Sequence, residues 1–126
     1  MKRKLIAGVN QDTLFLGLMD ELLREEGYDT VILKASGKAY QDIKHRQPAL
    51  VVLDIRINDP EAGFTVIDLL RIDPQTAYIP IIICSTATQI IRENEQRLRD
   101  KGCEILMKPF NIEELLALIA TIIGPP

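Results

Sequence analysis

Residue types that mark several classes of protein are scarce in this chain. It has no tryptophan, one histidine (His45), two cysteines and only 5% aromatic residues among 126 residues. A structural zinc site needs four cysteine or histidine ligands, more than the chain can offer. Cys84 and Cys103 fall at opposite ends of neighbouring predicted strands, too far apart for a disulfide, so we expect free thiols. His45 is expected on a solvated helix face.

An excess of positive charge and a long apolar run are also missing. The formal net charge is −3 and the isoelectric point is near 5.2. Because a protein binds nucleic acid through a basic face, we expect no direct nucleic-acid binding. A membrane span needs roughly 18 apolar residues in a row, and residues 1–4 lead into a strand-like segment without the apolar core of a signal peptide. We therefore expect a cytoplasmic protein without a membrane span.

The most informative stretch is residues 49–54, an apolar run that ends in Asp54. A continuous apolar run of this length between turn-forming residues is typical of a strand buried on both faces of a parallel sheet. Asp54 then lies at the carboxyl end of the strand, which is the edge where α/β sheets bind ligands. This placement favours a chemical role for Asp54 over a packing role.

Strand-like and helix-like segments alternate along the whole chain. We predict strands at 4–9, 30–34, 49–54, 80–84 and 103–107, and helices at 13–26, 36–46, 63–72, 88–101 and 112–123. Strands that alternate with helices form parallel sheets through right-handed crossovers. The predicted fold is α/β: a three-layer, doubly wound (βα)5 domain spanning residues 1–126. Its five-stranded parallel sheet has the flavodoxin-like order 2-1-3-4-5.

This topology brings polar residues from four strand ends to one edge. They are Asn10, Gln11 and Asp12 after the first strand, Asp54 after the third, Ser85 and Thr86 after the fourth, and Lys108 after the fifth. A carboxylate, a hydroxyl and an ammonium group together suit an anion carried covalently on Asp54.

Four short motifs then show a family resemblance. They are Val51-Val52-Leu53-Asp54, Ser85-Thr86, Lys108-Pro109-Phe110 and Glu26-Gly27-Tyr28. In this order and spacing, the chain resembles the receiver domain of two-component response regulators along essentially its whole length. The resemblance implies that Asp54 accepts a phosphoryl group from a sensor histidine kinase or a histidine phosphotransfer protein. It also implies that Ser85 hydrogen-bonds a phosphoryl oxygen and that Lys108 forms an ion pair with it.

The chain departs from the family where the metal is held. Asn10 and Gln11 occupy the positions of the paired acids that bind Mg²⁺ in the family. Since Mg²⁺ prefers carboxylate oxygens, we expect weak Mg²⁺ binding. The remaining candidate ligands are Asp54, the backbone carbonyl of Arg56, and Asp12, which is better suited to cap the helix at 13–26.

Two functions remain open at this point. The first is a working phosphoacceptor that switches a protein-interaction surface and catalyses at most its own phosphorylation and dephosphorylation, without being a metabolic enzyme. The alternative is a pseudo-receiver, an interaction module that works without phosphate. A flavin or nucleotide site is disfavoured because residues 10–12 are not the glycine-rich loop that binds phosphate.

Partner surfaces are predicted from apolar residues outside the core. Leu14 and Leu18 are four residues apart on one helix face, and in receivers this helix docks the kinase. Ile105 stands where many members carry a switching aromatic residue, and we group it with the partner-binding residues. The family's output face corresponds to residues 89–123, through which a downstream target or a second copy of the chain would bind.

Overall fold

The computed structural model confirms the predicted fold class. It describes residues 3–10, 13–34, 36–56 and 58–126, with the side chains of 13–16 left out. The elements in chain order are β1 (Leu5–Val9), α1 (Thr13–Glu26), β2 (Asp29–Leu33), α2 (Gly37–Arg46), β3 (Leu50–Leu53), α3 (Pro60–Ile72), β4 (Ile81–Ser85), α4 (Thr88–Asp100), β5 (Cys103–Met107) and α5 (Ile112–Ile123). All neighbouring strands pair in parallel, in the predicted order β2-β1-β3-β4-β5.

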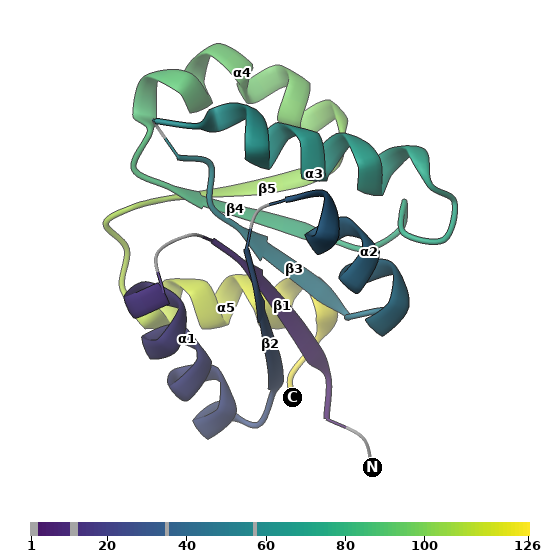
Figure 1. Cartoon of the computed structure of the whole chain (residues 1–126). Coiled ribbons are helices and arrows are strands. Elements are labelled where there is room, and N and C mark those ends of the chain that lie inside the picture. Colours follow the sequence, from purple (N-terminus) through teal and green to yellow (C-terminus); the bar gives the residue numbers. More distant parts are fainter. Residues whose placement is uncertain (1–2, 11–12, 35, 57) are drawn as a thin grey trace.

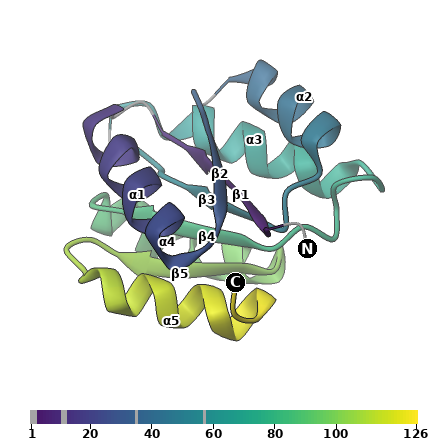
Figure 2. The ribbon, with the colours of Figure 1, turned by 90° about the horizontal axis from the view of Figure 1, so that it is seen from below.

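The sheet separates two apolar cores. Helices α1 and α5 cover one face, and α2, α3 and α4 cover the other (Figures 1 and 2). Because successive side chains of a strand point to opposite faces, the buried strand β3 contributes to both cores. Leu50 and Val52 pack in the α1/α5 core, while Val51 and Leu53 pack in the core under α2, α3 and α4.

The bounds of α3 differ from the prediction. The helix begins at Pro60 rather than at residue 63, with Asp59 as its N-cap residue. A proline at the first helical position loses no hydrogen bond, and its fixed φ suits a helix start. Residues 59 and 60 therefore begin the helix and do not belong to a separate loop before it. Strands β2 and β4 are each shifted by one residue from the prediction.

The ends of α1 and α5 follow the predicted signals. Gly27 stops α1 in a conformation with φ of +108°, which a residue without a Cβ atom adopts readily. At the start of α5, Asn111 accepts a hydrogen bond from the Glu114 amide, and the Glu114 side chain accepts one from the Asn111 amide. This reciprocal pair satisfies two amides that the helix leaves without helical partners.

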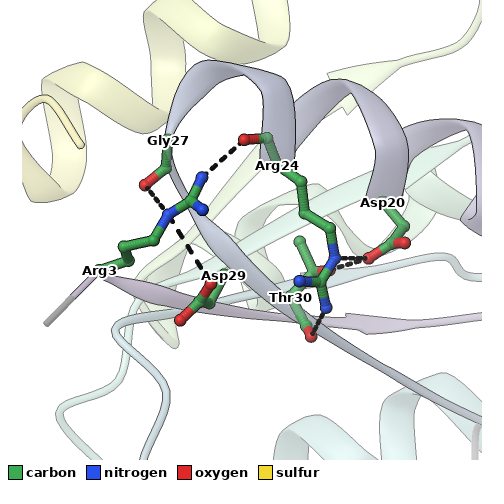
Figure 3. Close-up of polar contacts among 6 residues, drawn as sticks. All are labelled: Arg3, Asp20, Arg24, Gly27, Asp29 and Thr30. Carbon is green, nitrogen blue, oxygen red and sulfur yellow. Dashed lines mark hydrogen bonds and ion pairs between the residues drawn. The ribbon is translucent and has the colours of Figure 1, made fainter.

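Basic side chains close the amino edge of the sheet. Arg3 donates to the carbonyl oxygens of Gly27 (2.8 Å) and Arg24 (2.6 Å), and lies 3.7 Å from Asp29 (Figure 3). Arg24 in turn pairs with Asp20 at 2.9 Å. These bonds satisfy carbonyls at the carboxyl end of α1, where the helix dipole favours a cation.

Two further cations act in the same way at this edge. Lys4 donates to the carbonyls of Ile123, the last residue of α5, and Pro125, just beyond it, both at 2.7 Å. Arg71, at the end of α3, donates to three carbonyls that surround the starts of β4 and β5. They belong to Ala77 (3.0 Å), Ile79 (2.7 Å) and Lys101 (2.7 Å).

The predictions for the cysteines and the histidine are confirmed. Cys84 and Cys103 are both free thiols and both buried, on β4 and β5. Burial raises the pKa of the Cys84 thiol to about 12 and also raises the pKa of Cys103. His45 is exposed on α2. Within the described ranges, no helix is long and apolar enough to cross a membrane.

Candidate functional site

Asp54 and Lys108 meet at the carboxyl edge of the sheet. Asp54 directly follows β3, and its amide donates to the carbonyl of Val9 at 3.0 Å, which fixes it at the end of the strand. Lys108 directly follows β5, and its amide donates to the carbonyl of Ser85 at 2.8 Å. The Lys108 Nζ atom lies 3.5 Å from Asp54 Oδ2, with the two side chains 16% and 11% exposed. The site is therefore a largely enclosed carboxylate with one cation beside it.

Ser85 is the third predicted site residue and lies at the end of β4. It is buried, and its hydroxyl donates to the carbonyl of Ile55 at 2.6 Å and accepts from the amide of Ala87 at 2.9 Å. Thr86, the next residue, is exposed. The Ser85 hydroxyl thus links the backbone just after β3, at Ile55, to the backbone just before α4, at Ala87.

The structure describes part of the candidate metal-binding region. Asn10, at the position of a family acid, is only 2% exposed. Its backbone N–H donates to the carbonyl of Leu33 at 3.1 Å. The carbonyl of Arg56 accepts a hydrogen bond from the Asp59 amide at 3.3 Å. Gln11 and Asp12 lie outside the described residues.

The described donor groups at this edge can be compared with the ligands that Mg²⁺ prefers. Mg²⁺ is usually held through one or two carboxylates together with waters. In the described part of the chain no three His, Cys, Asp or Glu residues cluster so as to hold a metal ion. Asp54 offers a carboxylate at this edge, and the side-chain amide of Asn10 could offer an oxygen without charge.

A groove between α1 and α5 lies next to this edge. Leu18 on α1 is 58% exposed. It lines an apolar cavity of about 140 Å³ together with Met19, Leu22, Phe110, Ile112 and Leu115. The side chain of Leu14 lies outside the described part of the chain. The contributions of Phe110 and Ile112 were missed, although Phe110 stood in one of the motifs that carried the resemblance.

The face formed by α4, β5 and α5 combines charged and apolar side chains. Arg97 turns toward α3, where it pairs with Asp68 at 3.2 Å and lies 5.2 Å from the ring centre of Phe64. Ile105 is half-buried and packs on the core under α3 and α4. Ile105 lies on β5, the edge strand of the sheet.

Comparison with known proteins agrees with this geometry. The model of the response regulator receiver domain matches residues 6–120. The polar-differentiation response regulator DivK of Brucella ovis is 26% identical over 118 residues, which cover 92% of this chain and 93% of DivK.

Solved structures share the fold over nearly their full length. A putative response regulator from Chloroflexus aurantiacus superposes with a TM-score of 0.81 at 25% identity, covering 98% of this chain and 99% of that one. The receiver domain of the sensor histidine kinase PA1611 from Pseudomonas aeruginosa, solved with a magnesium ion in its active site cleft, gives 0.79 at 20% identity, covering 98% and 99%. Together with the family match, this shows that the chain belongs to the response regulator receiver domain family.

Proposed function

We propose that Asp54 accepts a phosphoryl group and that this modification switches a protein-interaction surface of the domain, in the cytoplasm. The observation that carries the proposal is the Asp54–Lys108 pair, 3.5 Å apart and largely enclosed at the edge where Ser85 also ends its strand. Phosphoryl transfer depends mainly on positioning and on neutralising oxygen charge, and these residues can supply both.

The proposed reaction forms one bond and breaks another. An Asp54 carboxylate oxygen attacks the phosphorus of a phosphohistidine, the new O–P bond forms, and the P–N bond to the donor breaks. Lys108 neutralises charge on the transferred group through charge-assisted hydrogen bonds. Ser85 becomes a donor to a phosphoryl oxygen when its hydroxyl turns away from the carbonyl of Ile55.

We propose that Mg²⁺ assists weakly. Asp54, the Arg56 carbonyl and Asp12 are its candidate ligands, and a bound ion would neutralise phosphoryl oxygen charge. Weak binding is expected because Asn10 and Gln11 provide no negative charge.

A sensor histidine kinase or a histidine phosphotransfer protein is the proposed donor, docking through the groove at Leu18, with Leu14 as part of the same surface. An apolar helix face suits this groove, because its lining is almost entirely apolar. Leu18→Glu should slow transfer from a phosphohistidine protein and leave phosphorylation by acetyl phosphate unchanged. Equal slowing with both donors, or with neither, would overturn the assignment of this groove.

For the output, we propose the face of α4, β5 and α5, including Ile105. A downstream protein or a second copy of the chain would bind there. Size-exclusion chromatography with and without beryllofluoride tests the second possibility directly, because phosphate-dependent dimerisation would shift the elution volume.

A pseudo-receiver remains the second candidate, and Asn10 is the observation that favours it. A buried amide at the position of a metal-binding acid is what a domain would carry if it bound partners without phosphate.

The two candidates are separated by a Mg²⁺ titration in the presence of acetyl phosphate. Intact-protein mass spectrometry would detect the added phosphoryl group, and NMR would follow Asp54 and the Ser85 region. A phosphoryl adduct that Asp54→Asn abolishes supports the phosphoacceptor. No adduct and no spectral response at high Mg²⁺ supports the pseudo-receiver, and an adduct that persists in Asp54→Asn refutes the acceptor assignment.

A further inference from the structure

Helix α3 touches the backbone of the candidate phosphoacceptor at Gly63. A Cβ atom built on Gly63 would lie 2.8 Å from Ile55 Cδ1 and 3.4 Å from the carbonyl oxygen of Asp54. A separation of 2.8 Å between two carbon atoms is well inside their optimal contact distance. Because Ile55 is fully buried under α3, it has little room to yield. A Cβ atom at position 63 would therefore have to displace Ile55 Cδ1 or move α3 away from residues 54 and 55.

The carbonyl of Ile55 holds the candidate hydroxyl. Ser85 donates its single hydroxyl proton to this carbonyl at 2.6 Å, and the Ser85 oxygen accepts the Ala87 amide at 2.9 Å. Ala87 is the residue directly before α4. A continuous set of contacts thus runs from α3 through Ile55 and Ser85 to the start of α4.

We propose that Gly63 is a positioning residue of the phosphoryl site. Without a Cβ atom at position 63, α3 holds residues 54 and 55 so that the Asp54 carboxylate faces Lys108 and the Ile55 carbonyl faces Ser85. A larger residue there displaces both groups together. The effect on phosphorylation rests on the proposed function of Asp54, whereas the effect on the Ser85 hydrogen bonds concerns the unmodified protein.

The arrangement also ties the hydroxyl to the switch. Ser85 has one proton, so it can donate to the Ile55 carbonyl or to a phosphoryl oxygen, but not fully to both. The position of the Ile55 carbonyl therefore sets how firmly the hydroxyl is held before phosphorylation.

A pair of substitutions tests this contact atom by atom. Gly63→Ala adds the clashing Cβ atom, and Ile55→Val removes Cδ1, the atom that it would meet at 2.8 Å. In the double variant Ile55→Val/Gly63→Ala the nearest remaining atoms lie at 3.4 and 3.6 Å, in ordinary contact. Gly37→Ala is the matched control, because Gly37 lies in a helix with open space around its Cα atom.

Three readouts are measured on each variant: thermal stability, the amide NMR signals of Ala87 and Lys108, and the rate of phosphorylation by acetyl phosphate with Mg²⁺. Gly63→Ala should shift both amide signals and slow phosphorylation by about tenfold, since sub-ångström misplacement of reacting groups is costly. The double variant should recover the wild-type signals and a rate within about twofold of wild type. Gly37→Ala should keep the wild-type signals.

The outcomes separate this proposal from the proposed function. If Gly63→Ala keeps the wild-type amide signals, or if the double variant is no closer to wild type than Gly63→Ala, Gly63 is not a positioning residue. The second criterion also applies if Gly63→Ala fails to fold. If the amide signals follow the expected pattern but the wild-type protein takes up no phosphoryl group, the positioning role stands and the phosphoacceptor function fails.

Discussion

Positive side chains have different partners at the two edges of this sheet. At the amino edge, Arg3, Lys4 and Arg71 donate to backbone carbonyls near helix ends and strand starts. At the carboxyl edge, Lys108 faces the carboxylate of Asp54 across 3.5 Å. The amino-edge cations mostly donate to neutral backbone carbonyls near helix ends and strand starts, and Arg3 also lies near Asp29. The carboxyl-edge cation instead faces the side-chain carboxylate that we propose as the phosphoacceptor.

This difference suggests that cations at one edge of the sheet serve stability and that the cation at the other edge serves the candidate site. Hydrogen bonds from a cation to backbone carbonyls contribute to stability, because removing the cation leaves several carbonyl acceptors without a donor at once. An ion pair between two side chains, by contrast, can be rearranged when one member gains a phosphoryl group. Substitution of the amino-edge cations should therefore reduce stability, and substitution of Lys108 should reduce phosphate handling.

Removal of Arg71 should produce the largest change in stability. Arg71→Ala removes three charge-assisted bonds to the carbonyls of Ala77, Ile79 and Lys101. We expect a loss of about 3 kcal/mol in the free energy of unfolding, measured by urea denaturation. Arg92→Ala, at an exposed arginine of α4, is the control and should change it by less than about 0.5 kcal/mol. Similar losses in both variants would remove the basis of the comparison.

Removal of Lys108 should affect ligand binding at the other edge. Lys108→Ala should weaken beryllofluoride binding at Asp54 by about 30-fold, or about 2 kcal/mol, because one charge-assisted bond is lost. Isothermal titration calorimetry gives the affinity, and Arg71→Ala, assayed at a temperature where it stays folded, should bind as wild type does. If Lys108→Ala binds equally well, Lys108 has no role at the phosphoryl site.

A cap at the carboxyl edge should have an intermediate effect on stability. Asn111→Ala removes the acceptor of the Glu114 amide at the start of α5. We expect a cost of about 1 kcal/mol, whereas Asn111→Ser, which keeps a capping oxygen, should cost less. Urea denaturation of the two variants tests the cap. Equal costs would show that the side-chain oxygen does not stabilise the helix.

The smallest expected effect appears only in acid. Hydrogen bonds from the Tyr40 hydroxyl and the Gln75 amide, and then the pairing with Lys44, lower the pKa of Asp73 from 3.8 to about 2. A lowered pKa in the folded state stabilises the fold above pH 3.8, and this stabilisation is lost as the pH falls toward 2. The difference in melting temperature between wild type and Asp73→Asn should therefore shrink between pH 4 and pH 2. A constant difference would mean that Asp73 does not stabilise the fold through its charge.

The sequence predicted the fold well because its signals were local and strong. The apolar run before Asp54 and the Asn111 cap each specify their element through nearby residues, and β5, α1 and α5 have the predicted bounds. The predicted start of α3 was wrong because proline is common both in turns and at the first position of a helix. Sequence pattern does not separate these two uses of proline.

The candidate site was predictable as a set of residue types but not as a set of contacts. Topology was enough to bring Asp54, Ser85 and Lys108 to one edge. The bond from Ser85 to the Ile55 carbonyl and the close approach of Gly63 depend on how α3 packs on β3, and no residue pattern encodes such a distance. The apolar groove needed Phe110 and Leu18, which lie 92 positions apart in the chain.

The two buried thiols have a practical consequence for probing this domain. Labelling reagents react with the thiolate form of an accessible cysteine, and Cys84 and Cys103 are enclosed and have raised pKa values. A cysteine introduced at an exposed position such as Gln89, near the start of α4, would then be the reactive one at neutral pH. A fluorophore or spin label could be attached there in the otherwise native sequence, and it would report on α4 directly.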